Sequence, residues 1–413
     1  MRKTVLSLFV FGTACLLWGQ DNQPPVITPD PGDTVRRPGE AFIWDAYVHD
    51  PDGDSWYVLN WSRPSWMSRS CTREFCAFTG HPTMADVGKH QVLLEVADEH
   101  GATAKVEFTI RVTQKKAVAD FDNDRATDFV YRLGDDFYFQ PIGKPVVRFA
   151  ATNMPEHAWP MVGHFDWDTR ADLAIWNPDN GEWHLHLSTE DWEHTQTLSF
   201  GLQPTDMPFV GDVNGDQIDE LIIRRWVNVN DGRWYVKEIG QAGYKMERFG
   251  GYETDIPMIG DFDGDLRAEM AIKRLNTRGE WYFKGFGEKT HTGPIYFGVQ
   301  NSDRVCPADY DGDDAVDPAL RRLEGWLPGH WYARLSSTDS NDLVTFGQRA
   351  TDIEVPGDYN GDGNAERAIY RPSTGEFIVH IDGENHFTRI GPAWNNLVPL
   401  LAPSTAKKDL LRN

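Results

Sequence analysis

The sequence predicts an all-β protein in which an N-terminal β-sandwich is followed by a β-propeller. Three observations lead to this class. The 413-residue chain holds 16 Trp, 13 Tyr, 22 Phe and 37 Gly, a composition typical of strands joined by tight turns. Residues 22–113 alternate apolar and polar side chains with a period of two. Residues 117–413 repeat a four-strand pattern at an almost constant interval.

The first twenty residues, 1–20, are predicted to be a secretory signal peptide. Arg2 and Lys3 precede an apolar run from Val5 to Trp18, which is too short for a stable membrane anchor. We therefore expect cleavage after Gly19 or Gln20 and no transmembrane anchor. The mature protein is expected to be secreted or at the cell surface, or periplasmic in a Gram-negative cell. Lipidation of Cys15 in a weak lipoprotein-like box is the alternative.

Residues 22–113 are predicted to form the small β-sandwich. Their alternating stretches include Ala41–Val48, Gln91–Ala97 and Ala104–Val112, with turn residues between them. Cys71 and Cys76 flank the sequence TREF, which favours a disulfide at the tip of a hairpin in an oxidising compartment. Two reduced thiols are the alternative. Cys306 is expected to be a small buried residue.

The stretch PSWMSRSCTREFCAFTGHPTMADVGKHQVLLEVADEHGATAKVEFTIRV resembles dystroglycan-type cadherin-like domains and Ig-like domains. The resemblance covers most of this predicted sandwich. It implies one Ca²⁺ site made by Asp50, Asp52, Asp54 and Asp98. An ordinary turn rich in Asp and Gly is the alternative.

The repeat region is built from units with the same internal order. A short apolar strand leads into a nine-residue acidic loop, and a second strand, an aromatic third strand and a last strand follow. The first positions of the loops stand 44, 48, 49, 48 and 49 residues apart. Four short strands per unit are typical of propeller blades, which bury both faces only against their neighbours. The loops are Asp120–Asp128, His164–Asp172, Asp212–Glu220, Asp261–Glu269, Asp309–Asp317 and Asp358–Glu366.

The acidic loops place oxygen-bearing side chains at positions 1, 3, 5 and 9. Carboxylates this close repel one another unless a cation lies between them. Ca²⁺ accepts six to eight oxygen ligands in a flexible geometry, so it is the expected cofactor. An EF-hand is excluded because its loop closes at position 12 between helices.

Residues 117–413 resemble the FG-GAP/VCBS repeats of integrin-α-like propellers in their loops and in their Phe-Gly ends. The resemblance implies about five Ca²⁺ sites, each completed by the backbone carbonyl at loop position 7. In the second loop His164 replaces the first Asp, and we expect Asp166, Asp168 and Asp172 to make a weak or empty site. The implied ligands of the five sites are Asp120, Asp122, Asp124 and Asp128; Asp212, Asn214, Asp216 and Glu220; Asp261, Asp263, Asp265 and Glu269; Asp309, Asp311, Asp313 and Asp317; and Asp358, Asn360, Asp362 and Glu366.

Seven blades are expected, because a further partial unit begins at Leu397 and stops near Arg412 without metal ligands. The alternative is six blades with a C-terminal clasp.

Four tryptophans outside the repeated pattern are candidate ligand-binding residues on the surface opposite the acidic loops: Trp159, Trp226, Trp326 and Trp394. Exposed indoles on a rigid scaffold suit sugar rings or a partner's apolar side chains. Packing between blades is the alternative. Arginines that end the second strands are expected to form structural pairs with aspartates that recur in the links between blades. A ring of arginines that attracts acidic polymers is the alternative.

The composition also bounds the function. The formal net charge is −23, and no basic run or basic domain is present, so nucleic acid is not an expected partner. No known catalytic constellation is found, and we assign no catalytic residue. We expect the protein to bind an extracellular protein or glycan, as an adhesion or recognition module, rather than to act as an enzyme. The alternatives are a carbohydrate-active enzyme, either a polysaccharide lyase or a hydrolase, and a structural subunit of an extracellular assembly.

Overall fold

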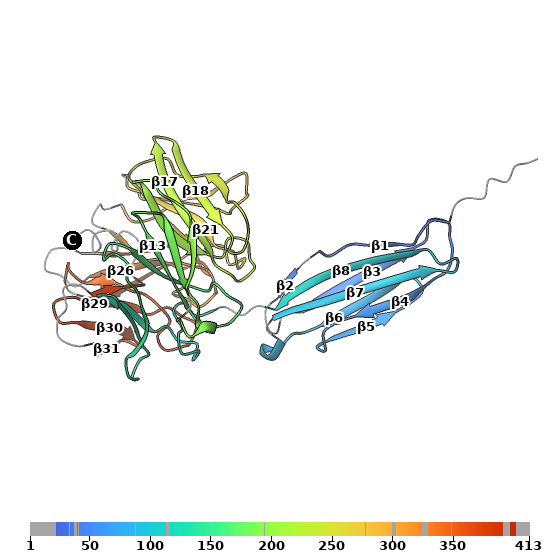
Figure 1. Cartoon of the computed structure of the whole chain (residues 1–413), viewed down its shortest axis with the longest axis horizontal. Helices are drawn as coiled ribbons and strands as arrows, with labels where there is room; N and C mark the ends of the chain where they lie inside the picture. Colours follow the sequence, from blue (N-terminus) through green and yellow to red (C-terminus); the bar gives the residue numbers. More distant parts are fainter. Residues whose placement is uncertain are drawn as a thin grey trace, which may run out of the picture. The chain divides into compact units, whose positions relative to one another are not determined.

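The computed structural model divides the chain into two compact units, Met1–Gln114 and Lys115–Asn413 (Figure 1). It describes residues 22–32, 34–36, 39, 41–86, 88–112, 116–193, 195–276, 278–299, 303–323, 329–347, 349–390 and 397–401. The predicted signal peptide and Cys15 lie outside these residues. The described structure is all-β apart from two 3-10 helices, η1 (Met84–Asp86) and η2 (Ser188–Glu190). None of the described helices is long and apolar enough to cross a membrane.

The first unit consists of two four-stranded sheets that share one core. Its strands are β1 (Val26–Thr28), β2 (Thr34–Arg36), β3 (Phe42–His49), β4 (Trp56–Ser62), β5 (Met67–Cys71), β6 (Phe75–Gly80), β7 (Gly88–Asp98) and β8 (Thr103–Val112). One sheet has the order β1-β3-β6-β5 and the other β2-β8-β7-β4. Every second residue of β3 is buried, from Phe42 to Val48, and packs against β7 and β8 residues such as Leu94 and Phe108. The alternation in the sequence thus marks the core face.

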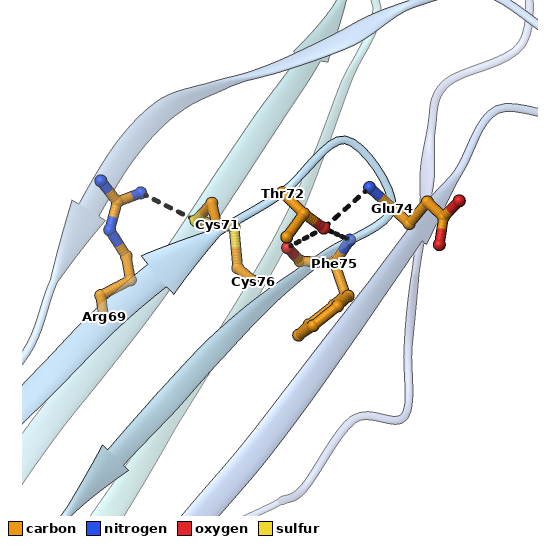
Figure 2. Close-up of a disulfide and its surroundings, with 6 residues drawn as sticks. All are labelled: Arg69, Cys71, Thr72, Glu74, Phe75 and Cys76. Atoms are coloured by element: carbon orange, nitrogen blue, oxygen red, sulfur yellow. Dashed lines mark hydrogen bonds between the residues drawn. A yellow bond between two sulfur atoms is a disulfide. The ribbon is translucent and has the colours of Figure 1, made fainter.

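A disulfide joins Cys71 and Cys76, which are directly paired on β5 and β6 (Figure 2). The turn between them is held by Thr72, whose Oγ1 accepts the backbone N–H groups of Glu74 and Phe75, both at 3.2 Å. The predicted bridge is therefore present in the structure.

Within its described residues, the second unit consists of six four-stranded antiparallel sheets, numbered in chain order. The first sheet has the order β11-β10-β9-β32, and each of the others is formed by four consecutive strands. The first sheet contains β9 (Phe129–Leu133), β10 (Asp136–Gln140), β11 (Val147–Ala151) and β32 (Leu397–Pro399). The second contains β12 (Trp159–Gly163), β13 (Asp172–Asn177), β14 (Glu182–His186) and β15 (Thr195–Ser199). The third contains β16 (Asp206–Gly211), β17 (Glu220–Asn228), β18 (Asp231–Lys237) and β19 (Lys245–Arg248).

The remaining three sheets follow the same order. The fourth contains β20 (Asp255–Gly260), β21 (Glu269–Arg274), β22 (Glu280–Lys284) and β23 (Thr292–Tyr296). The fifth contains β24 (Arg304–Val305), β25 (Ala319–Arg322), β26 (His330–Arg334) and β27 (Asn341–Thr345). The sixth contains β28 (Ile353–Glu354), β29 (Arg367–Arg371), β30 (Glu376–Ile381) and β31 (Glu384–Arg389).

Apolar clusters join each sheet to the next and the sixth sheet to the first. Phe137 and Phe139 of the first sheet pack with Leu173 of the second, and clusters of the same kind connect the following sheets. The last cluster joins Phe129 of β9 to Phe377 of β30. Because each sheet is covered by two neighbours, no single sheet has to bury both of its faces alone.

The expectation of a seventh blade has to be corrected, because its expected first strand belongs to the first sheet. Leu397, Val398 and Pro399 form β32, which pairs with β9 and completes the first sheet. The second strand expected near Arg412 lies outside the described residues. The expectation failed because the partner of β32 is about 260 residues earlier in the chain, and pairing at such a distance leaves no periodic signal. The alternative of six units closed by the C-terminal segment agrees with this pairing.

The aromatic third strands are hydrogen-bonded to the Phe-Gly ends of the repeats. Trp183 and Trp234 are fully buried, and their indole Nε1–H groups donate to the carbonyl oxygens of Phe200 and Phe249 at 2.8 and 2.9 Å. Trp281 bonds to Phe297 in the same way, and Trp331 to Phe346. A buried indole needs such an acceptor, so each bond fixes the last strand against the third.

Candidate metal centres in the acidic loops

The six acidic loops share one internal hydrogen bond. The carboxylate at position 9 accepts the backbone N–H of position 2, for example Asp128 from Phe121 at 2.8 Å and Glu269 from Phe262 at 2.6 Å. The other four loops repeat this bond. The position-9 side chain is therefore turned back into its own loop.

The position-1 aspartates organise the turn itself. Asp261 accepts the N–H groups of Gly264 and Leu266 at 2.7 and 2.8 Å, and Asp358 accepts those of Gly361 and Gly363. Leu266 has a φ of 71°, a conformation that costs a side-chain-bearing residue free energy. The loop is shaped so that its carboxylates face a common centre.

A ring of backbone hydrogen bonds connects the six loops. The N–H of position 8 in each loop donates to the carbonyl oxygen of position 1 in the preceding loop. Ala171 donates to Asp120, Asp219 to His164, Ala268 to Asp212, Val316 to Asp261 and Ala365 to Asp309, at 2.6–2.7 Å. Thr127 of the first loop donates to Asp358 of the last and closes the ring. The loops therefore form one continuous edge of the second unit.

Carboxylate oxygens converge in several of the loops. Oxygen atoms of Asp261, Asp263, Asp265 and Glu269 all lie within 4.8 Å of one another. Asp120, Asp122 and Asp128 form a similar group, as do Asp166, Asp168 and Asp172, and Asp309, Asp311 and Asp317. Hard oxygen donors in this number suit a divalent cation.

Unpartnered oxygens supply a test of the fit that is independent of this clustering. Asp128 has no exposed surface, and its Oδ1 atom has no hydrogen-bond partner. The Oδ1 atoms of Asp122 and Asp311 are likewise buried without a partner. A buried carboxylate oxygen without a partner is costly, and a cation bound in the loop would satisfy it. The donor set therefore fits a metal ion.

Burial and mutual repulsion raise the pKa values of these carboxyl groups. Burial, aided by neighbouring aspartates, raises the pKa of Asp128 to about 8 and that of Glu269 to about 8. The pKa of Glu220 rises to about 9 and that of Glu366 to about 7 for the same reasons. Without a cation, the protein therefore holds protons on groups that are usually ionised at neutral pH.

The turn between the third and fourth strands supplies donors that the sequence analysis missed. Lys144 Nζ lies 2.6 Å from Asp122 and 2.7 Å from Asp124. The first loop therefore holds an ammonium group beside two of its expected metal ligands. In the second loop, Ser188 and Thr189 donate hydroxyl hydrogen bonds to Asp168 and Asp166, both at 2.6 Å. The recurrence of Leu-Ser at Leu187-Ser188 and Leu335-Ser336 was the available signal.

The fifth loop has the same hydroxyl donors. Ser336 Oγ donates to Asp313 and Asp317, and Ser337 Oγ donates to Asp311. In the third loop, the side-chain Nδ2–H of Asn214 donates to Glu220 Oε1 at 2.6 Å. His164 of the second loop is buried, which lowers the pKa of its ring to about 3 and keeps the ring neutral.

The proposed ligands of the first unit are largely engaged in turns. Asp50 accepts the N–H groups of Asp52 and Asp54, and Asp98 accepts those of His100 and Ala102. One group of described residues in this unit, Asp54, Glu99 and His100, has ligand atoms within 4.8 Å of one another.

The candidate tryptophans differ in burial. Trp159 is 9% exposed and belongs to the core between the second and third sheets, so it is not an exposed platform. Its position at the start of β12 places it between neighbouring sheets, which the sequence pattern did not reveal. Trp226 is half-buried and donates its indole N–H to Gly251. Trp326 and Trp394 lie outside the described residues.

The predicted Arg–Asp pairs are present in four sheets. Arg225 binds Asp206, and Arg274 binds Asp255, through two hydrogen bonds each. Arg322 with Asp303, and Arg371 with Asp352, repeat the arrangement. In the first sheet Arg132 donates to backbone carbonyl groups instead, among them that of Met154.

No protein-family model and no curated protein matches the sequence. Among solved structures, the chain is similar to Aleuria aurantia lectin in complex with Fucalpha1-6GlcNAc, at 9% identity and a TM-score of 0.38, over 77% of this chain and 95% of that one. It is similar to a putative phosphatase from Bacteroides thetaiotaomicron at 9% identity and a TM-score of 0.35, over 88% and 85% of the two chains. Titin domain M7 matches 23% of this chain over its whole length, at 12% identity and a TM-score of 0.18. At these TM-scores the similarities do not bear on function.

Proposed function

We propose that this chain is a secreted or cell-surface calcium-binding recognition protein. Its second unit is a six-bladed β-propeller of the FG-GAP/VCBS type, and its first unit is a cadherin-like or Ig-like sandwich. Ca²⁺ in the acidic loops stiffens one edge of the propeller, and the propeller surface binds an extracellular protein or glycan.

The buried, unpartnered Oδ1 atom of Asp128 is the observation that supports this proposal most strongly. It lies in a group with Asp120 and Asp122, and this kind of donor set recurs around the ring of loops. Bound Ca²⁺ supplies positive charge that these oxygens otherwise lack. The residues then hold the loop closed, because the same aspartates also accept the backbone N–H groups of the turn.

The experiment that tests the proposal measures metal binding and partner binding on the same sample. The purified protein is titrated with Ca²⁺ calorimetrically, then applied to a glycan array and to extracellular protein extracts, with and without chelator. Binding of Ca²⁺ and metal-dependent retention of a partner support the proposal. Partner binding that persists in chelator, while the fold is intact, contradicts the role given to the metal.

A further inference from the structure

A cavity of about 230 Å³ lies between the fourth and fifth sheets, beside the fourth acidic loop. Phe262, Phe283 and Ile295 line it from the fourth sheet, and Pro318 and Leu335 line it from the fifth. Polar side chains surround this apolar part: Asp263, Glu269, Glu288, Thr292, Arg334, Ser336 and Asp339.

The chain itself shows what fits this place, because the corresponding space between the first and second sheets is filled by Trp192. The indole of Trp192 is 6% exposed. Its ring centre lies 5.8 Å from that of Phe121 and 6.3 Å from that of Phe139, the counterparts of Phe262 and Phe283. The indole N–H donates to the carbonyl oxygen of Ala171 at 3.2 Å.

The two turns that border these spaces align without a gap and share Leu, Ser and Asp at their first, second and fifth positions. Leu187 to Trp192 reads LSTEDW, and Leu335 to Ser340 reads LSSTDS. Ser340 therefore aligns with Trp192 of the earlier repeat. It carries no aromatic ring and is not among the residues that line the cavity. A cavity of about 150 Å³ is enough to bind benzene, so the larger cavity here accepts an indole or a phenol ring.

The charges at the cavity favour a basic neighbour for that ring. Glu288 and Asp339, which are not ligands of the proposed metal site, stand against a single lining cation, Arg334, which is paired with Asp339 at 2.5 Å. Trp192, which fills the corresponding space, also has a basic neighbour, because the guanidinium of Arg170 lies 4.2 Å from its ring centre.

We propose that this cavity binds an aromatic side chain of a partner polypeptide whose neighbouring residue is basic. The inference rests on the proposed function, since it names the partner's chemistry for the same recognition surface. The aromatic ring packs on Phe262 and Phe283 as Trp192 packs on Phe121 and Phe139. The basic side chain lies against the carboxylate of Glu288.

The test uses N-acetyl-Trp-Arg-amide as the probe, with N-acetyl-Leu-Arg-amide and maltohexaose as comparisons, in calorimetric titrations of the full chain. The Trp peptide is expected to bind more tightly than the Leu peptide by about tenfold or more, as for an aromatic hot spot. Ser340→Trp, which copies Trp192, is expected to abolish this binding. Glu384→Trp places the same side chain on exposed β31 and is expected to leave binding of the Trp peptide unchanged.

Trp192→Ala supplies a second, independent arm. It opens the matching space between the first and second sheets and is expected to add a second site for the Trp peptide. Equal binding of the two peptides, undiminished binding to Ser340→Trp, or preference for maltohexaose would overturn the inference. Calcium content is measured on each sample: lost peptide binding with calcium retained contradicts this inference alone, whereas absence of calcium contradicts the proposed function.

Discussion

The backbone N–H of Thr127 donates to the carbonyl oxygen of Asp358 at 2.6 Å, and so joins the first acidic loop to the last. The two residues are 231 positions apart in the sequence, yet their bond repeats the one that connects every other pair of consecutive loops. In addition, β32 of the C-terminal segment pairs with β9. The second unit is therefore closed at two levels, by loop-to-loop hydrogen bonds and by a shared sheet.

The closing strand is predicted to carry much of the stability of the second unit. Leu397 is 3% exposed and packs with Phe129 and Tyr131, so Leu397→Ala should lower the free energy of unfolding by about 2–5 kcal/mol. Urea denaturation checks this value. Leu343→Ala, at an exposed site on β27, is the control and should change it by less than about 0.5 kcal/mol. An unchanged stability in Leu397→Ala would show that β32 does not close the ring.

Lys144 is predicted to compete with a metal ion for the first loop. Its ammonium contacts Asp122 and Asp124, so Lys144→Gln should lower the melting temperature in chelator and enlarge the rise that added Ca²⁺ produces. Lys105→Gln removes an ammonium that pairs with Glu107 in the first unit and serves as the control. Equal calcium responses in the two variants would argue against competition at this loop.

The metal-free protein is predicted to lose stability as the pH rises. Burial raises the pKa values of Asp128 to about 8 and Glu366 to about 7, above their ordinary values of 3.8 and 4.5. The folded state therefore binds more protons than the unfolded state between pH 4 and 8, and the stabilisation present below about pH 4 is lost as the pH passes through the folded pKa values. The melting temperature in chelator should fall from pH 5 to pH 8.

Calcium should reverse this trend, because the ion binds only ionised carboxylates. At saturating Ca²⁺ the melting temperature should stay level or rise over the same range. Parallel pH profiles with and without the metal would contradict the assignment of these groups to a cation site.

The repeated Arg–Asp pairs are predicted to hold the sheets rather than bind ligand. The side chain of Asp255 has no exposed surface, so Arg274→Met leaves a buried charge unpaired and should cost about 3–5 kcal/mol of stability. The double variant Arg274→Met/Asp255→Leu removes both charges and should recover most of that loss. Chemical denaturation of the two variants makes the comparison, and a double variant no more stable than Arg274→Met would speak against a pair of this kind.

The sequence was informative where the physics is local. The acidic loops, the aromatic third strands and the Arg–Asp pairs all follow from short periodic patterns, and the described structure contains each of them. Disulfide pairing of Cys71 and Cys76 was also predictable, because the two residues flank one tight turn.

Interactions between distant or irregular residues were not predictable. The partner of β32 lies near the other end of the unit, and the burial of Trp159 depends on the neighbouring sheet. Lys144 reaches the first loop from a turn that has no counterpart sequence in the other repeats. Such contacts depend on how the sheets pack and leave no pattern along the chain.

Calcium content is the most direct test of the central claim that the acidic loops are cation sites. The full chain is equilibrated with millimolar Ca²⁺, freed of unbound ion, and measured by elemental analysis together with its thermal unfolding. We predict about five calcium ions per chain, one for each loop that begins with Asp, and a clear fall in melting temperature on chelation, since saturation at about 100 times Kd contributes about 2.7 kcal/mol per site. Folded protein that retains no calcium, and whose melting temperature is the same in chelator, would contradict the account.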